Sequence, residues 1–223
     1  MMGKLIVIEG VDASGKATQT KLLYEYLLNK KGNVLKIEFP DYESPSSSLV
    51  KMYLNGEFGE NADDVNPYVA STFFAADRFA SYKTKWEKFY KEDYIIVLDR
   101  YVTANMIHQA SKFNTKEEKE KFINWLCDYE YGLYSLPQPD IKIFLDVPVS
   151  ISRELMKERL NKFSGEEAKD IHERDEGYLE KTYENAKFVA ENYGFNIINC
   201  VKDNKLRTID DIQEEIRKIA DGI

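Results

Sequence analysis

Residues 4–18 read KLIVIEGVDASGKAT, and this stretch determines the class of fold. The run from Leu5 to Ile8 is apolar and rich in β-branched side chains, which predicts a buried strand. From Gly10 to Lys16 the sequence matches G-x-x-x-x-G-K, in which glycines let backbone N–H groups turn inward around phosphate oxygens. A helix that begins at the end of such a loop adds positive potential. The stretch therefore predicts a strand, a phosphate-binding loop and a helix in succession.

This loop is expected to bind the phosphates of ATP, with Lys16 reaching the β- and γ-phosphates. A tight turn with a surface lysine is the alternative, and the position of the motif between a strand and a helix disfavours it. The residues expected to contact ATP here are Gly10, Val11, Asp12, Ala13, Ser14, Gly15, Lys16, Ala17 and Thr18.

The loop lacks the hydroxyl that normally ligates Mg²⁺, because Ala17 stands where the pattern has serine or threonine. Thr18 cannot simply replace it, since one residue along a helix turns by about 100°; a contact with the α-phosphate is the role expected for Thr18. Mg²⁺, the expected cofactor, would then be held by phosphate oxygens, water and a carboxylate. Asp99, at the end of the third strand, is the candidate metal ligand, and a salt bridge closing the strand end is the alternative.

Apolar runs alternate with segments of helical period along the chain. Continuous apolar strands separated by helices predict a parallel sheet covered on both faces, which is a three-layer α/β fold. Residues 1–223 are expected to form one domain, and the charged segment over about 163–176 is expected to be a loop. The expected strands are 4–8, 34–39, 94–98, 141–147 and 196–201, and the expected helices are 19–31, 49–54, 66–90, 103–112, 116–129, 148–162, 177–193 and a last helix capped by Thr208.

Composition excludes several classes of protein. The 223 residues are 43% hydrophobic and 13% aromatic, which argues for a packed core and against a disordered chain. A net charge of −8 argues against a nucleic-acid polymer or an anionic membrane as partner, since both need summed positive charge. The apolar runs are far shorter than the roughly 20 residues that cross a bilayer. No charged-then-apolar targeting leader is recognised, so a cytoplasmic location is expected. Cys127 and Cys200 are expected to be reduced thiols.

Four short segments occur in order along the chain: Ile8–Asp12, Phe39–Asp41, Phe74–Arg78 and Asp99–Tyr101. Together they resemble the thymidylate kinase family, P-loop enzymes that phosphorylate dTMP with ATP. The resemblance extends over the whole chain. It implies a P-loop kinase fold, with a five-stranded parallel sheet, helices on both faces and a short lid at about 163–176. It also implies a homodimer formed through helices that flank the acceptor site.

The resemblance implies a role for each matching residue. Asp12 would face the sugar 3′-hydroxyl or the transferred phosphate, and Phe74 would stack on the thymine ring. Arg78 would contact the base or the monophosphate, and Arg100 would hold the acceptor phosphate, because guanidinium groups pair bidentately with phosphate. The alternatives are a core position for Phe74 and surface ion pairs for both arginines. The residues expected to bind the acceptor are Asp12, Phe39, Tyr42, Phe74, Arg78, Arg100, Asn105 and Gln109.

The chain departs from the family pattern near the acceptor site. Tyr42 stands where the family often has an arginine directed at the acceptor phosphate. Further on, Ala104 replaces a serine and His108 replaces a tyrosine. These changes bear on acceptor specificity more than on the reaction class. Asn105 and Gln109 are suited to amide contacts with a pyrimidine edge or, equally, to a polar helix surface.

The resemblance also implies that the lid supplies positive charge for phosphoryl transfer, because Ala13 leaves the phosphate loop without an arginine. Arg159 is expected to be catalytic, together with Lys16, Asp12 and Arg100, while Arg153 is expected to bind ATP. A solvated charged surface is the alternative for this whole segment. The basic residues available there are Arg153, Arg159, Lys162, Lys169 and Arg174.

Two further positions are less informative. The resemblance implies that adenine lies between the lid helix and the loop at about 201–206, where no residue stands out. His172 is expected to be exposed, since in-line phosphoryl transfer needs no dedicated imidazole.

The sequence thus favours a kinase that transfers the γ-phosphate of ATP to dTMP and yields dTDP and ADP. One alternative is a kinase for another pyrimidine nucleotide or a deoxynucleoside. The other is a non-catalytic nucleotide-binding module, which the missing hydroxyl at Ala17 would favour.

Overall fold

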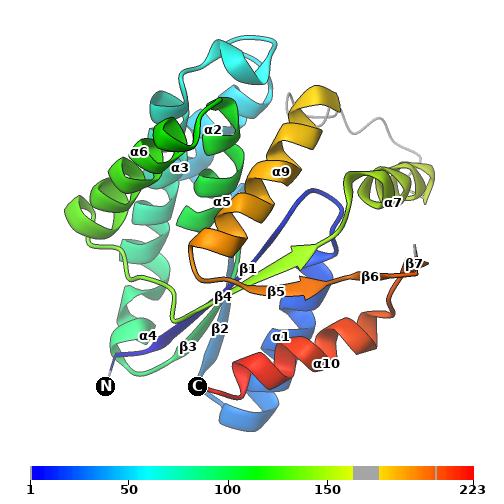
Figure 1. The fold of residues 1–223 in the computed structure, drawn as a ribbon. Coiled ribbons are helices and arrows are strands. Elements are labelled where there is room, and N and C mark those ends of the chain that lie inside the picture. The colour runs from blue at the N-terminus through cyan, green and yellow to red at the C-terminus, as the bar shows by residue number, and fades with distance from the viewer. Residues whose placement is uncertain (1, 163–175, 204) are drawn as a thin grey trace.

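The computed structural model describes residues 2–162, 176–203 and 205–223, and within them five parallel strands form one sheet (Figure 1). The strand order is β2-β3-β1-β4-β5, so the strand before the phosphate loop lies in the centre. The three inner strands, β3, β1 and β4, are largely apolar, as expected of a parallel sheet with both faces covered. The strands are β1 (Lys4–Gly10), β2 (Val34–Glu38), β3 (Ile95–Asp99), β4 (Ile141–Asp146) and β5 (Asn196–Asn199).

Helices cover both faces of the sheet, which confirms the three-layer α/β fold (Figure 1). The helices are α1 (Lys16–Lys31), α2 (Ser48–Leu54), α3 (Pro67–Ser81), α4 (Glu87–Lys91), α5 (Val102–His108), α6 (Lys116–Cys127), α7 (Val149–Lys162), α9 (Glu176–Asn192) and α10 (Ile209–Ala220).

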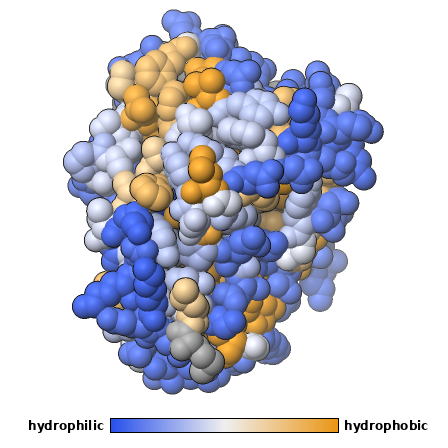
Figure 2. Space-filling view, turned by 90° about the vertical axis from the view of Figure 1, so that its left-hand side faces the viewer, coloured by the Kyte–Doolittle hydropathy of each residue, from blue (hydrophilic) through white to orange (hydrophobic). Residues whose placement is uncertain are grey.

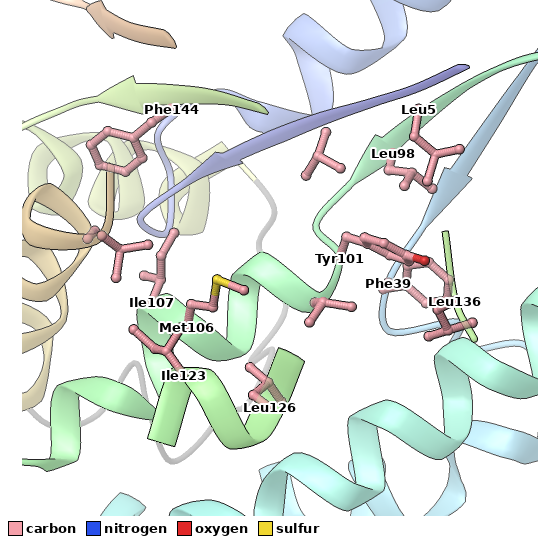
Figure 3. Close-up of a cluster of buried hydrophobic side chains, with 14 of the residues drawn as sticks. Leu5, Phe39, Leu98, Tyr101, Met106, Ile107, Ile123, Leu126, Leu136 and Phe144 are labelled. Carbon is pink, nitrogen blue, oxygen red and sulfur yellow. The ribbon is translucent and has the colours of Figure 1, made fainter. Parts of the chain in front are cut away.

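The alternation of side chains along the strands divides the core in two. Leu5, Leu98 and Phe144 face the larger side, where they pack with residues of α5, α6 and α9. Figure 3 shows this cluster, with Met106 of α5 and Ile123 of α6 directed toward the sheet. Helix α5 is therefore held against this face of the sheet.

The intervening strand residues form the second half of the core. Ile6, Val97 and Leu145 face the opposite side of the sheet, where α1 and α10 lie. The two helices pack on this face through Leu23 and Ile216, both fully buried. The first helix is therefore fixed to the sheet directly after the phosphate loop.

The long helix expected over 66–90 is present but contains an irregular turn. Asn66 caps α3 through a bond from the Tyr68 N–H, and Pro67 occupies the first turn, as the sequence indicates. The chain then passes through a π-helical turn at Tyr82–Trp86 into α4. Tyr82 and Trp86 both lie in the buried core, with ring centroids 4.6 Å apart.

The strand expected over 196–201 is wrong at its end. The parallel strand stops at Asn199, and the chain forms a small antiparallel hairpin of β6 (Val201–Lys202) and β7 (Lys205–Leu206). Arg207 closes its base, because its N–H donates to the carbonyl of Cys200. The expected loop over 163–176 lies outside the described residues, apart from Glu176 at the start of α9.

Among the described residues, no helix combines the length and the apolar character needed to cross a bilayer. Cys127 and Cys200 are free thiols, half-buried and buried respectively.

Leu98 lies on β3, between β2 and β1, and is a test of the packing. Leu98→Ala removes a fully buried side chain and should lower the free energy of unfolding by about 2–5 kcal/mol. Leu49→Ala, at a side chain that is 45% exposed on α2, is the matched control and should change it by less than about 0.5 kcal/mol. Urea denaturation of both variants measures the difference. Equal losses would contradict this description of the core.

Candidate active site

The candidate site lies where the carboxyl ends of β1 and β3 meet. Ile8 pairs with Asp99 across the two strands, and the N–H of Arg100 donates to the carbonyl of Ile8 at 3.2 Å. The phosphate loop and the segment Asp99–Tyr101 are therefore neighbours, although 88 positions separate Asp12 from Arg100.

The phosphate loop has the backbone geometry that its glycines allow. Gly15 has a φ of 85°, and a Cβ at Gly10 would lie 2.5 Å from the hydroxyl of Ser14. Lys16 is buried, and its ammonium donates to the carbonyls of Gly10 (2.9 Å) and Val11 (2.8 Å). Burial, together with the nearby charge of Arg100, lowers the pKa of Lys16 to about 8. The Lys16 ammonium, which the motif predicts to bind phosphate, thus contacts the backbone of its own loop in this structure.

The remaining loop positions are accessible in different degrees. Asp12 and Ala13 are half-buried, whereas Ser14 is buried. Ala17 and Thr18 are exposed in the first turn of α1, on the helix whose N-terminus follows the loop. The structure thus brings the expected ATP-contacting residues from 10 to 18 together at one helix end.

Sequence reasoning missed the part that Glu9 plays. Its side chain is fully buried, and Oε1 accepts from the N–H of Tyr101 (3.1 Å) and the hydroxyl of Thr103 (2.6 Å). Oε2 has no hydrogen-bond partner among the described residues. Burial outweighs the neighbouring cations and raises the pKa of Glu9 to about 7. A charged residue at the end of an apolar strand was the available signal.

Arg100 occupies a strained corner after β3. Its φ of 64° lies in the left-handed region, which non-glycine residues seldom adopt. Nη2 donates to Oδ1 of Asp12 at 2.5 Å, and Nη1 lies 2.7 Å from Nε2 of His108. Burial disfavours the charge of Arg100, but the neighbouring carboxylates of Asp12 and Glu9 outweigh it and raise the pKa of Arg100 above its ordinary value.

A cavity opens beside this corner, between the phosphate loop, the end of β2 and helices α3 and α5. It contains all eight residues expected to bind the acceptor and four that were not expected. Its lining consists of Asp12, Phe39, Pro40, Tyr42, Leu54, Phe74, Arg78, Arg100, Ala104, Asn105, His108 and Gln109.

Arg78 lines this cavity, and its positive charge is neutralised by an ion pair with Glu130. Its Nε and Nη2 donate to the two carboxylate oxygens of Glu130, both at 2.6 Å, and Nη1 donates to the carbonyl of Tyr101 at 3.3 Å. Arg78 and Glu130 are 1% and 0% exposed, so a surface ion pair is the wrong description. Nothing in the sequence pointed to Glu130, which lies 52 positions away.

Asn105 of α5 and Gln109, the residue directly after this helix, are buried, at 3% and 1% exposure. The alternative of a polar helix surface is therefore wrong. Gln109 Oε1 has no hydrogen-bond partner among the described residues, while Asn105 Nδ2 lies 3.5 Å from the carbonyl of Ser71. A buried amide oxygen without a partner at a cavity wall is suited to a polar ligand.

Phe74, also in the cavity lining, is half-buried and packs against a small core cluster that includes Tyr53, whose ring it meets edge to face at 6.1 Å. The neighbouring loop is held by Asp77, whose carboxylate accepts from the N–H of Asp41 (2.8 Å) and the hydroxyl of Ser46 (2.5 Å). This loop carries Tyr42 to the mouth of the cavity, where the side chain is largely exposed.

Asp99 is the last residue of β3, at the edge of the sheet where the phosphate loop also lies, so its carboxylate is a candidate metal ligand. Burial raises its pKa, and the nearby charge of Lys16 opposes that rise. None of the ion pairs found among the described residues involves Asp99, so the salt-bridge alternative has no support there. The described residues contain no cluster of three metal-ligating side chains. A single carboxylate such as that of Asp99 suits Mg²⁺, which commonly takes one or two carboxylates and completes its shell with phosphate oxygens and water.

The basic residues expected from the lid are only partly described. Arg153 is half-buried in α7, whose first residue, Val149, follows β4 at the same edge of the sheet. Arg159 and Lys162 belong to α7, but their side chains lie outside the described residues, as do Lys169, His172 and Arg174 entirely.

Comparison with known proteins identifies similar chains. The family model named thymidylate kinase matches residues 8–216. The thymidylate kinase of Mycobacterium tuberculosis strain H37Rv is 31% identical over 179 residues, which are 80% of this chain and 81% of the relative. That of Plasmodium falciparum is 28% identical over 217 residues, which cover 97% and 89%. The solved structure of Candida albicans thymidylate kinase superimposes with a TM-score of 0.68 at 24% identity, covering 99% and 92%.

The raised pKa of Glu9 predicts a pH-dependent effect on stability. Its carboxyl titrates near 7 when folded and near 4.5 otherwise, so ionisation opposes folding as the pH rises between these values. Glu9→Gln keeps the Oε1 acceptor and cannot ionise. The free energy of unfolding of Glu9→Gln minus that of the unchanged protein should therefore be larger at pH 8 than at pH 5, by at most about 3 kcal/mol.

Urea denaturation at both pH values, without nucleotide, measures this difference. Glu25→Gln, at an exposed position of α1, is the control for removing one carboxylate from the chain. A stability difference between Glu9→Gln and the unchanged protein that stays constant with pH would contradict the prediction.

Proposed function

The chain belongs to the thymidylate kinase family of ATP-dependent phosphotransferases, and we propose that dTMP occupies the cavity beside its phosphate loop. The γ-phosphate of ATP would pass in line to the phosphate of dTMP and yield dTDP and ADP. The observation that carries this proposal is the cavity, because aromatic, amide and guanidinium groups line it next to a loop suited to ATP phosphates.

The two arginines suit different parts of dTMP. Arg78 is neutralised by Glu130, so its remaining N–H groups suit a neutral acceptor such as the O4 of thymine. Arg100 lies beside Asp12 at the edge of the phosphate loop, where an acceptor phosphate has to meet ATP. We assign Arg78 to the base and Arg100 to the phosphate.

The remaining contacts follow from side-chain chemistry. Phe74 offers a ring face for stacking on thymine, and Asn105 and Gln109 offer amides to the edge of the base. Phe39 and Tyr42 line the cavity beyond the end of β2, and Asp12 would face the 3′-hydroxyl or the phosphate. The phosphate loop, from Gly10 to Thr18, binds ATP, with Arg153 as a further contact.

Catalysis would depend on position and positive charge. The transition state of phosphoryl transfer spreads negative charge over the equatorial oxygens, which Lys16 and Arg100 would stabilise. Arg159 is proposed to add charge from α7. Asp99 would hold Mg²⁺ together with the phosphates and water, and the metal would supply further neutralisation of phosphate charge when bound.

We also propose a homodimer that uses the face of α3. Val69 and Phe79 of this helix and the adjacent Leu133 are exposed apolar residues, and Phe79 packs on Tyr134 at 4.9 Å. Figure 2 shows apolar residues within the hydrophilic surface on the side where α3, α4 and α6 lie. Sedimentation of the protein and of Phe79→Asp tests this, since a dimer should dissociate in the variant.

A cytoplasmic location completes the proposal. Cys127 and Cys200 are unpaired thiols, as expected in a reducing compartment. ATP as co-substrate is consistent with that compartment.

The proposed reaction predicts a pattern of acceptor use. With ATP and Mg²⁺, coupled ADP release should be fastest with dTMP among dTMP, dUMP, UMP, CMP and thymidine, and should fall to the acceptor-free level when Mg²⁺ is chelated. Preference for another acceptor would retain the chemistry and replace the substrate. Binding of both nucleotides without turnover would favour a non-catalytic module, in line with Ala17.

Removal of the loop cation tests the ATP site. Lys16→Ala should reduce kcat by at least about a hundredfold, because it removes a charge placed beside the transferred phosphate. Lys21→Ala, at an exposed lysine of the same helix, is the matched control and should leave kcat unchanged. Thermal melts verify that both variants fold. Near-normal turnover of Lys16→Ala would overturn the assignment of the loop.

A further inference from the structure

His108 is the last residue of α5 and is 9% exposed at the wall of the cavity. Its backbone is tied down, because its carbonyl accepts from the hydroxyls of Tyr178 (3.0 Å) and Ser111 (2.7 Å). Tyr178 belongs to α9, so contacts from a separate helix fix the position from which the imidazole projects.

The contact with Arg100 fixes the chemical state of this ring. Nε2 of His108 lies 2.7 Å from Nη1 of Arg100. A guanidinium only donates hydrogen bonds, so Nε2 has to carry a lone pair, and the ring is neutral with its proton on Nδ1. A protonated imidazole would place two donors and two positive charges against each other.

The number of donors left on Arg100 is compatible with a phosphate contact. A guanidinium has five N–H groups, and the contacts with Asp12 and His108 use one on each terminal nitrogen. Three therefore remain. Because both terminal nitrogens are held, the plane of the guanidinium is fixed before any ligand arrives.

The two partners of Arg100 differ in what they do to its charge. The carboxylate of Asp12 neutralises it and competes with any incoming anion, whereas a neutral imidazole orients the guanidinium without cancelling its charge. Arg78 provides the contrast inside the same cavity, since Glu130 both orients and neutralises it.

We infer that His108 is a positioning residue that orients Arg100, without itself cancelling the charge, for the phosphomonoester group of the acceptor. The inference rests on the proposed function in one respect, the assignment of Arg100 to the acceptor phosphate. His108 acts through Arg100 and does not itself touch the reacting atoms. Its replacement should weaken the binding of the phosphate and leave the binding of the nucleoside part unchanged.

Three substitutions separate this role from a general effect on the cavity. His108→Gln can place an acceptor at the position of Nε2, His108→Asn can place one only at the position of Nδ1, and His108→Leu offers none. We expect the Asn and Leu variants to bind dTMP about tenfold more weakly, which is the effect of losing one charge-assisted hydrogen bond. The Gln variant should recover most of the affinity.

Calorimetric Kd values for dTMP and for thymidine provide the decisive comparison, with thermal melts to verify folding. Thymidine lacks the phosphate, so its Kd should be the same in all three variants and in the unchanged protein. In steady-state kinetics, the KM for dTMP should rise in the Asn and Leu variants, while the KM for ATP should not change. On an Arg100→Ala background, His108→Leu should have no further effect on the Kd for dTMP.

Several results would overturn the inference. An equal loss of thymidine and dTMP affinity would make His108 part of the nucleoside site, and an additive loss on the Arg100→Ala background would separate it from Arg100. Unchanged dTMP affinity in the Leu variant would exclude any role. Failure of the proposed function is distinguishable, because the unchanged protein would then bind dTMP no better than thymidine.

Discussion

The buried carboxylate of Glu9 joins the two halves of the site. It ends the apolar part of β1, directly before the phosphate loop, and holds the N–H of Tyr101 and the hydroxyl of Thr103 at the start of α5. Through these bonds, the strand that positions the ATP site also positions the helix that lines the acceptor cavity. The left-handed backbone of Arg100 is stable because the neighbouring residue is anchored in this way.

Charge in the site is arranged around this anchor. Lys16 and Arg100 lie near Glu9, Asp12 and Asp99, and burial shifts the pKa values of Lys16 downward and of Glu9 and Asp99 upward. Such opposed shifts in a small region are typical of functional sites. Arg78 and Glu130, in contrast, form a closed pair at the other end of the cavity. At the phosphate-loop end Arg100 is also paired, with Asp12, but its contacts with Asp12 and His108 leave three N–H groups for an anion.

The sequence was informative where chemistry lies next to a strand end. Parallel strands place their carboxyl ends at one edge, so Asp12, Asp99 and Arg100 could be expected together from their positions alone. Partners from distant segments could not be predicted in this way. Glu130 reaches Arg78 across 52 positions through tertiary packing. His108 lies only 8 positions from Arg100, but no sequence pattern indicated their contact. The hairpin after β5 also escaped prediction, since strands of two residues leave no periodic pattern.

The self-contact of Lys16 has a consequence for the thermodynamics of nucleotide binding. Its ammonium donates to two loop carbonyls, and burial lowers its pKa to about 8. In mildly alkaline solution, a fraction of the free protein therefore has Lys16 as the neutral amine. The phosphates of ATP bring negative charge to the same place and raise that pKa. Binding of ATP is then coupled to proton uptake, and the heat of binding depends on the ionisation enthalpy of the buffer.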